Sequence, residues 1–223
     1  MIKVKVINLP VRTDRLEEIK KELFIQKITD YEVINPVIEV DPVKSLRNTA
    51  AQLLMEVYEE RNEFALILED DCEFINTSNI IKTLEEAVKE LDEVNPFWEM
   101  LYLGANTTIP LVRINPPSSE TLPLFRLEKG YGTHAILYNV KNLTSVLETL
   151  VFPEIFCKSE VVKKLGVNVP LDILYVEEVQ GWGNCYITGE LFAIQRPSFS
   201  DIEGRRVNYA NLIQDRFKLN VKK

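Results

Sequence analysis

Apolar runs and amphipathic segments alternate along the N-terminal half of the chain, and this alternation restricts the fold more than any other feature. The apolar runs are rich in Val, Ile, Leu and aromatic residues, whereas the amphipathic segments carry apolar side chains at helical spacing. The predicted strands are residues 3–9, 31–40, 64–69 and 98–104, and the predicted helices are residues 14–27, 45–62 and 78–94. We therefore predict an α/β fold with a mainly parallel central sheet flanked by helices.

The rest of the chain continues this pattern less regularly. Residues 105–123 contain several prolines among polar residues and predict an irregular loop. Residues 130–139 predict a further strand, residues 170–179 a helical segment, and residues 185–197 a hairpin or paired strands. Because no linker or internal repeat interrupts the sequence, we expect a single domain.

Composition narrows the classes of protein that the chain can belong to. It has 223 residues, of which 46% are hydrophobic and 27% charged, as in soluble globular domains. A formal net charge of -8 argues against a nucleic-acid partner, and we find no apolar stretch long enough for a transmembrane segment. The three cysteines show no CxxC spacing, so we expect neither a disulfide scaffold nor a structural zinc site, and we expect a cytoplasmic location.

Three adjacent acids follow the apolar run 64–69, at Glu69, Asp70 and Asp71. Neighbouring carboxylates repel one another and resist leaving water, so they need either solvent or a positive partner. The simpler interpretation is a solvated strand end with Asp71 capping a turn. The alternative is a site for Mg²⁺ or Mn²⁺, which prefer carboxylate oxygens and usually share them with phosphates, and Asp70 and Asp71 suit that role.

Other polar residues are predicted at the same edge of the sheet, because ligands of open α/β sheets gather at the carboxyl ends of the strands. Asn8, Arg12 and Arg15 follow the first strand, and Gly104 ends a later one. Arg12 and Arg15 could hold a phosphate group. They could equally belong to a solvated first helical turn, with Arg15 paired to a nearby acid.

Two further residues have both a structural and a functional interpretation. His134, the only histidine, stands among apolar neighbours and is more typical of a core residue, although imidazole also suits divalent metals. Asp172 lies between apolar residues and is either a helix cap or a buried functional carboxylate. Trp98, Trp182, Tyr102 and Tyr131 could stack on a base or a sugar ring, but aromatic residues this sparse are usually part of the core.

Taken together, six stretches in order resemble glycosyltransferase family 25, which contains lipooligosaccharide and collagen galactosyltransferases. They span residues 3–203, nearly the whole chain. The stretches are "VINLPVRTDRLEEIKKEL", "LILEDDCEF", "WEMLYLGAN", "GTHAILYNVKNLTSVLE", "VPLDILY" and "AIQRPSFSDI". Each motif is unspecific by itself, and the specificity lies in their order and approximate spacing.

The resemblance implies a GT-A type (Rossmann-like) fold over residues 1–223, with a nucleotide-sugar-binding half at 1–104 and an acceptor-side half at 105–223. It also implies transfer of galactose or glucose from a nucleotide-sugar donor, typically UDP-linked, to a glycan hydroxyl with inversion, assisted by Mn²⁺ or Mg²⁺.

The resemblance assigns roles to the candidate residues. Glu69, Asp70 and Asp71 would serve as the Asp-x-Asp equivalent, with Asp71 as the most direct metal ligand. Asn8, Arg12, Arg15 and Gly104 would lie near the nucleotide, and His134 is a further candidate metal ligand. Inversion needs a base, for which Asp172 is the first candidate and Asp201 the second. Ser200 and Asp201 could instead cap the final helix.

One departure from the family pattern keeps other functions open. Many family members carry a Gly-Cys-x-x-Ser-His element on the helix before the acidic strand, whereas residues 45–61 here contain neither His nor Cys. A catalytically silent protein that binds a nucleotide sugar or a glycan is therefore an alternative. A metal-dependent phosphohydrolase is another, although no second acidic cluster is evident. Motifs of dinucleotide-binding proteins, P-loop NTPases and GxSxG hydrolases are missing.

Overall fold

The computed structural model describes residues 1–116, 122–200 and 202–221, and an eight-stranded sheet lies at its centre. The strands follow one another across the sheet in the order β2 (Glu32–Ile34), β1 (Ile2–Ile7), β3 (Phe64–Glu69), β10 (Ala135–Asn139), β5 (Met100–Tyr102), β11 (Cys185–Thr188), β8 (Leu124–Arg126) and β7 (Val112–Arg113). β10 and β8 run opposite to the other six. Strands from both halves of the chain interleave in one sheet, which confirms the predicted single α/β domain.

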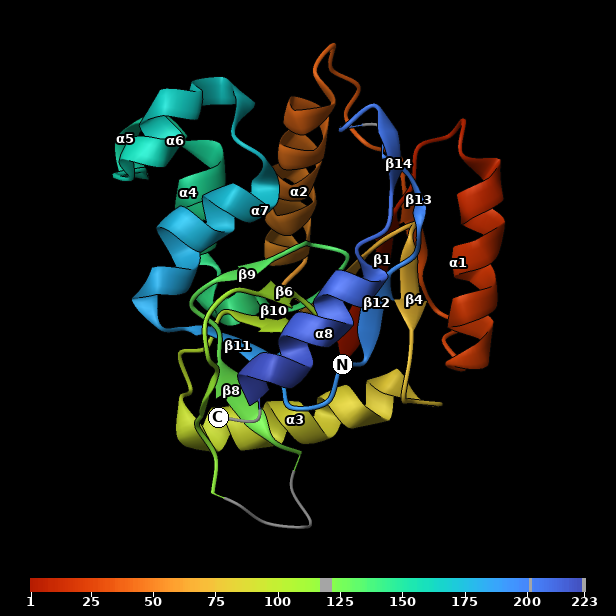
Figure 1. The fold of residues 1–223 in the computed structure, drawn as a ribbon, viewed down its shortest axis with the longest axis vertical. Helices are drawn as coiled ribbons and strands as arrows, with labels where there is room; N and C mark the ends of the chain where they lie inside the picture. Colours follow the sequence, from red (N-terminus) through yellow and green to blue (C-terminus); the bar gives the residue numbers. More distant parts are fainter. Residues whose placement is uncertain (117–121, 201, 222–223) are drawn as a thin grey trace.

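Helices cover both faces of this sheet (Figure 1). α1 (Thr13–Ile25) and α3 (Ile80–Val94) pack on one face, and the other face is covered mainly by α2 (Pro42–Glu59), α4 (Thr144–Val151), α7 (Leu171–Leu174) and α8 (Ala210–Val221). α5 (Pro153–Phe156) and α6 (Glu160–Leu165) lie between α4 and α7 in sequence, and a π-helical turn, Tyr175–Val179, follows α7. Alternating side chains of the central strands feed the two cores: Leu66 and Leu68 belong to one, Ala65 and Ile67 to the other.

Three two-stranded ribbons surround the sheet. They are β4 (Cys72–Phe74) with β12 (Ala193–Gln195), β13 (Ser198–Ser200) with β14 (Arg205–Val207), and β6 (Asn106–Thr107) with β9 (Gly130–Tyr131). The β4–β12 ribbon joins segments more than a hundred residues apart in sequence, and it carries the chain past the end of β3. This pairing positions the candidate site.

Several sequence predictions need correction. The strand predicted over 31–40 shortens to β2, because the following residues turn toward Asp41, whose side chain caps α2 by accepting from the Val43 N–H at 2.9 Å. Residues 185–197 do not form a hairpin, since β11 belongs to the central sheet and β12 pairs with β4. The strand predicted over 130–139 divides into β9 and β10, and the loop predicted over 105–123 contains β6 and β7.

Candidate active site

The carboxyl ends of β1 and β3 lie side by side, where Ile7 is in register with Glu69. β10 runs antiparallel to β3, so its beginning reaches the same edge of the sheet. The backbone N–H of Glu69 donates to the carbonyl of His134 at 3.0 Å. The topology therefore brings together three segments: the turn after β1, the acids after β3, and residues 132–134 before β10.

Arg15 is the positive partner of the acidic strand end. It stands in the first turns of α1, which places its guanidinium over the end of β3, and its side chain is buried. Nη1 donates to Asp70 Oδ1 at 2.9 Å and lies 3.7 Å from Asp71 Oδ2. Nη2 donates to Ser198 Oγ at 2.8 Å and to the carbonyl of Phe199. One buried guanidinium thus links both acids to β13, as one of the alternatives for Arg15 anticipated.

Asp71 has one satisfied and one free carboxylate oxygen. Oδ2 accepts a hydrogen bond from Gln195 Nε2 at 3.0 Å, and the Asp71 carbonyl accepts from the Arg196 N–H at 2.7 Å. Oδ1 is buried and has no hydrogen-bond partner among the residues that the structure describes. A buried carboxylate oxygen without a donor is costly, so this atom is suited to a ligand.

The pKa values of two acids are raised. Burial is the main cause that raises the pKa of Asp70 to about 6, and Arg15 opposes it. The pKa of Glu69 rises to about 8, because burial and the nearby charge of Asp71 disfavour its ionised form. The Thr133 hydroxyl donates to Glu69 Oε1 and opposes this shift. Glu69 is therefore mostly protonated at neutral pH in the free protein.

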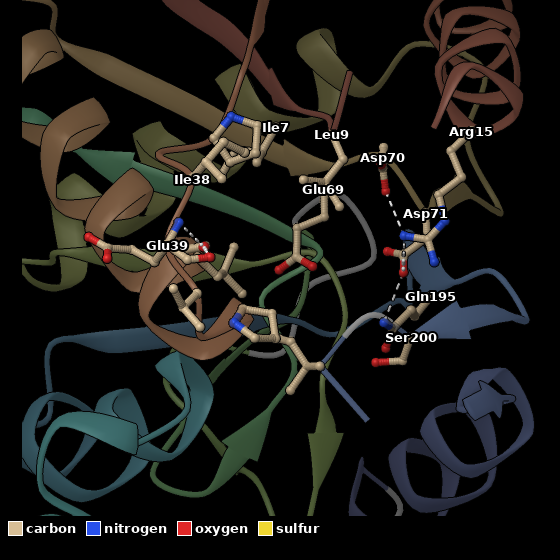
Figure 2. Close-up of a pocket in the computed structure, with 16 residues that line it drawn as sticks. Ile7, Leu9, Arg15, Ile38, Glu39, Glu69, Asp70, Asp71, Gln195 and Ser200 are labelled. Atoms are coloured by element: carbon tan, nitrogen blue, oxygen red, sulfur yellow. Dashed lines mark hydrogen bonds and ion pairs between the residues drawn. The ribbon is translucent and has the colours of Figure 1, made fainter. Parts of the chain in front are cut away.

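Two cavities meet at this edge of the sheet. One, named the donor-side cavity after the role that we propose for it below, has a volume of about 300 Å³ and is lined by Arg15, the three acids and side chains from residues 36–46. The other, named the acceptor-side cavity after the role that we propose for it below, has a volume of about 390 Å³ and is lined by residues 131–133, Asp172, the turn after β13 and α8. Residues common to both are Leu46, Glu69, Gln195, Ser200 and Ile202. Figure 2 shows the Glu69 carboxylate pointing into the donor-side cavity between Glu39 and Gln195.

Asp172 reaches the acceptor-side cavity from the start of α7. Its Oδ1 accepts a hydrogen bond from the backbone N–H of Ile173 at 2.8 Å. Burial raises the pKa of Asp172, while the backbone N–H groups of Ile173 and Gly132 oppose the shift. An acid whose pKa is raised is a stronger base once ionised, which suits proton abstraction.

The other predicted residues lie around this core of the site. Arg12 pairs with Asp14, Nε to Oδ1 at 3.2 Å, and also donates to the carbonyl of Phe199. Asn8 is buried, and its Nδ2 donates to the Leu9 carbonyl at 2.9 Å. Gly104 packs against β12, where an added Cβ would lie 1.9 Å from the Ala193 carbonyl oxygen, so close packing explains this glycine without a ligand.

His134 and Asp201 complete the predicted set. His134 is 1% exposed, and neither of its ring nitrogens has a hydrogen-bond partner of standard geometry within the described part of the chain. Burial lowers the pKa of His134, and the nearby Asp71 charge works against that change. Asp201 lies outside the described residues, so its predicted role as a base stays a prediction. The predicted cap of the final helix by Ser200 and Asp201 is wrong, because α8 begins only at Ala210 and Ser200 belongs to β13.

Three residues of the site were missed by the sequence analysis: Thr133, Gln195 and Ser198. Their side chains contact Glu69, Asp71 and Arg15 respectively. Gln195 had a usable signal, because a polar residue ending the apolar run "LFAI" repeats the pattern of Glu69 after "FALIL". Thr133 and Ser198 stand in short polar stretches that resemble ordinary turns, so no local pattern selects them.

The carboxylate oxygens of the site suit a divalent cation that takes few of its ligands from the protein. Among residues 1–116, 122–200 and 202–221, no group of three or more His, Cys, Asp or Glu side chains is arranged to hold a metal ion. Mg²⁺ and similar cations are commonly bound by one or two carboxylates and completed by phosphate oxygens and water. The free Oδ1 of Asp71 suits this mode, whereas Asp70 is engaged by Arg15.

Comparisons with known proteins find only distant structural similarities. No protein-family model matches the sequence, and no curated protein matches it. Among solved structures, A197 from STIV is 11% identical with a TM-score of 0.45, covering 92% of each chain. Mannose-1-phosphate geranyltransferase from Thermus thermophilus is 12% identical with a TM-score of 0.44, covering 84% of this chain and 73% of its own. Mouse xyloside xylosyltransferase 1 is 10% identical with a TM-score of 0.41, covering 83% of this chain and 71% of its own.

Proposed function

We propose that this protein is a glycosyltransferase that moves a hexose from a nucleotide-sugar donor, UDP-linked, to a hydroxyl group of a glycan acceptor with inversion. The observation that carries the proposal is the position of Glu69 and Asp71. They stand at the carboxyl end of a central strand, where a donor-side and an acceptor-side cavity meet. Transfer between two substrates requires two adjoining cavities that share a reacting point, and the sequence resemblance supports the same reaction.

On the donor side, the diphosphate would bind near Arg15 and Asp71. We propose Asp71 as the metal ligand, since its Oδ1 lacks a partner in the described chain. When bound, a divalent cation would offset the negative charge that builds on the departing diphosphate. Arg15 holds Asp70 and keeps the acidic end of β3 compact through its bonds to β13. Residues 36–46 supply an apolar wall for the rest of the donor.

On the acceptor side, Asp172 would accept the proton of the attacking hydroxyl. Inversion requires the acceptor to approach from the face opposite to the leaving diphosphate, so the base must lie across the reacting centre from Asp71. Asp172 lines the acceptor-side cavity and not the donor-side one, which supports its assignment as this base, and its raised pKa increases its basicity. Thr133 and Gln195 hold Glu69 and Asp71 in place, so the acids enter the reaction already oriented.

The donor assignment is tested by thermal unfolding with a panel of nucleotide sugars, with and without Mn²⁺. A donor present at about 100 times its dissociation constant should stabilise the folded state by about 2.7 kcal/mol, which raises Tm by roughly 5–10 °C. The shift should require Mn²⁺ and disappear in Asp71→Asn, and it should persist in Asp30→Asn, which changes an exposed acid beyond the C-terminal end of α1. Absence of any shift in the wild type would refute the donor site.

The base assignment needs a variant that still binds the donor. Asp172→Asn should keep the donor-induced Tm shift and lose transfer activity by about a hundredfold or more. Full activity in this variant would remove Asp172 from the mechanism. A protein that binds donor strongly but transfers to no acceptor would instead favour the silent binding protein.

A further inference from the structure

A third cavity, a groove of about 620 Å³, lies where β7, β8 and β11 meet the C-terminal end of α3. Figure 1 shows β8 and β11 close to α3, well away from the β13–β14 ribbon that borders the acidic cavities. No residue that lines this groove also lines either acidic cavity, within the described chain. The groove is therefore a separate feature of the surface.

The wall of the groove is a row of side chains across three strands. Arg126 on β8 is in register with Tyr186 on β11 and with Val112 on β7. Residues directly opposite in antiparallel strands project from the same face of the sheet, so these three side chains stand next to one another. Trp182 and Gly183, at the end of the turn Gln180–Trp182, line the groove as well.

Hydrogen-bonding groups form the floor of the groove. Asn95, which ends α3, donates from Nδ2 to Asn184 Oδ1 at 3.1 Å and to the Tyr186 hydroxyl at 2.8 Å. Tyr186 is 3% exposed, and its hydroxyl proton has no acceptor in the part of the chain that the structure describes. A buried hydroxyl that accepts one bond and still has a proton to donate is suited to an oxygen of a ligand.

The charge of the groove is opposite to that of the whole protein. Arg113 and Arg126 line it, and no acidic residue does among those described, although the chain has a net charge of -8. The Arg113 guanidinium donates to the backbone carbonyls of Asn115, at 3.0 Å, and Pro116, at 3.2 Å, and it forms no ion pair with a carboxylate of the described residues. Arg126 is exposed and forms no ion pair with any described residue, so it is available to an anion.

Trp182 gives the groove a flat apolar surface. Its side chain is 66% exposed, whereas Trp98, the other tryptophan, is fully buried and stacked on Phe64. Lys158 Nζ lies 5.9 Å from the centroid of the Trp182 ring, which adds a third cation beside the groove. An exposed indole next to amides, a hydroxyl and an arginine combines an apolar platform with directional polar contacts.

We propose that this groove binds an anionic saccharide, a sugar that carries a carboxylate or a phosphate group. The apolar face of the sugar ring would lie on Trp182, a hydroxyl oxygen would accept from Tyr186, and Arg126 would bind the acidic group. Arginine forms paired hydrogen bonds to both carboxylates and phosphates, so Arg126 suits either acidic group. A nucleic acid fits less well, because the net negative charge of the protein repels an extended polyanion. The site does not depend on the proposed transfer reaction.

The test uses Trp182 as its own reporter. Acrylamide quenches an exposed indole and spares the buried Trp98, so protection from quenching measures occupancy of the groove. The probes are trigalacturonate for the carboxylate, glucose 6-phosphate for the phosphate, and neutral maltotriose as the comparison. We expect protection by at least one anionic probe at millimolar concentration, and binding weakened by about tenfold or more in Arg126→Ala, since a hydrogen bond to a charged group is lost.

Two control variants separate this site from the rest of the protein. Lys89→Ala, which removes an exposed cation from α3, and Asp71→Asn, which removes the proposed donor site, should both bind the anionic probe like the wild type. Protection by only one of the two anionic probes would identify the acidic group. Equal protection by maltotriose, or unchanged affinity in Arg126→Ala, would overturn the requirement for an anion, and no protection by any probe would overturn the site.

Discussion

Glu69 should make the free protein less stable as pH rises, and Glu69→Gln should remove that loss. The carboxyl pKa is raised from an ordinary 4.5 to about 8, so the folded state binds a proton that the unfolded state has already released between these values. Stability therefore falls through this interval as pH increases. At about 1.4 kcal/mol per pH unit, ionising Glu69 in the folded state costs about 5 kcal/mol once pH exceeds 8.

Glutamine keeps the shape of the side chain and cannot ionise. Its carbonyl oxygen can still accept from the Thr133 hydroxyl, so the local hydrogen bond is preserved. We expect the free energy of unfolding of Glu69→Gln to exceed that of the wild type by a margin that grows by about 4 kcal/mol between pH 5 and pH 8. If the proposed transfer reaction holds, the same variant should lose most of that activity, because the acid shared by the two cavities can no longer ionise.

Urea unfolding, followed by circular dichroism in metal-free buffer at a series of pH values, measures this margin. Glu59→Gln, at an exposed position near the end of α2, controls for the removal of one charge, and its margin over the wild type should stay nearly constant. Parallel curves for Glu69→Gln and the wild type from pH 5 to pH 8 would refute the reasoning, since they would mean that Glu69 titrates alike in the folded and unfolded states.

Two further substitutions test the packing and the charge of the site. Gly104→Ala should lower the free energy of unfolding by about 3 kcal/mol in urea titrations, because the new Cβ meets the Ala193 carbonyl oxygen; Gly181→Ala, with open space around it, should change stability by less than about 1 kcal/mol. Arg15→Met should cost about 3–5 kcal/mol at pH 8, since Asp70 loses its buried partner. Lowering the pH to 5 should recover part of that loss by protonating Asp70, and an equal loss at both values would contradict this explanation.

Much of the fold was predictable because the decisive signals are local. Val, Ile and Leu alternate or cluster in the runs that become β1 and β3, and apolar residues recur at helical spacing in α1, α2 and α3. Asp41 caps the N-terminus of α2, as is typical of a short polar residue that precedes a proline at the first helical position. The start of α1 is less typical, because Asp14 pairs with Arg12 and the helix begins without a side-chain cap.

Local composition also bears on whether a segment of the chain could span a membrane. Along the described parts of the chain, no helix combines the length and the apolar composition that crossing a bilayer requires.

The strand predicted over 31–40 shows the limit of local sequence signals. Its apolar residues suggested a long strand, yet of this segment only Glu32–Ile34 (β2) pair with β1, and the exposed Ile38 lines the donor-side cavity instead.

By itself, the sequence determined that three acids end an apolar strand and that basic residues follow an earlier one. Tertiary structure alone decided which of them meet. The insertion of β10 between β3 and β5 brings Thr133 to Glu69, and the pairing of β12 with β4 brings Gln195 to Asp71. These contacts depend on strand order and register, which arise from the burial of two whole faces of a sheet, and no local pattern encodes them.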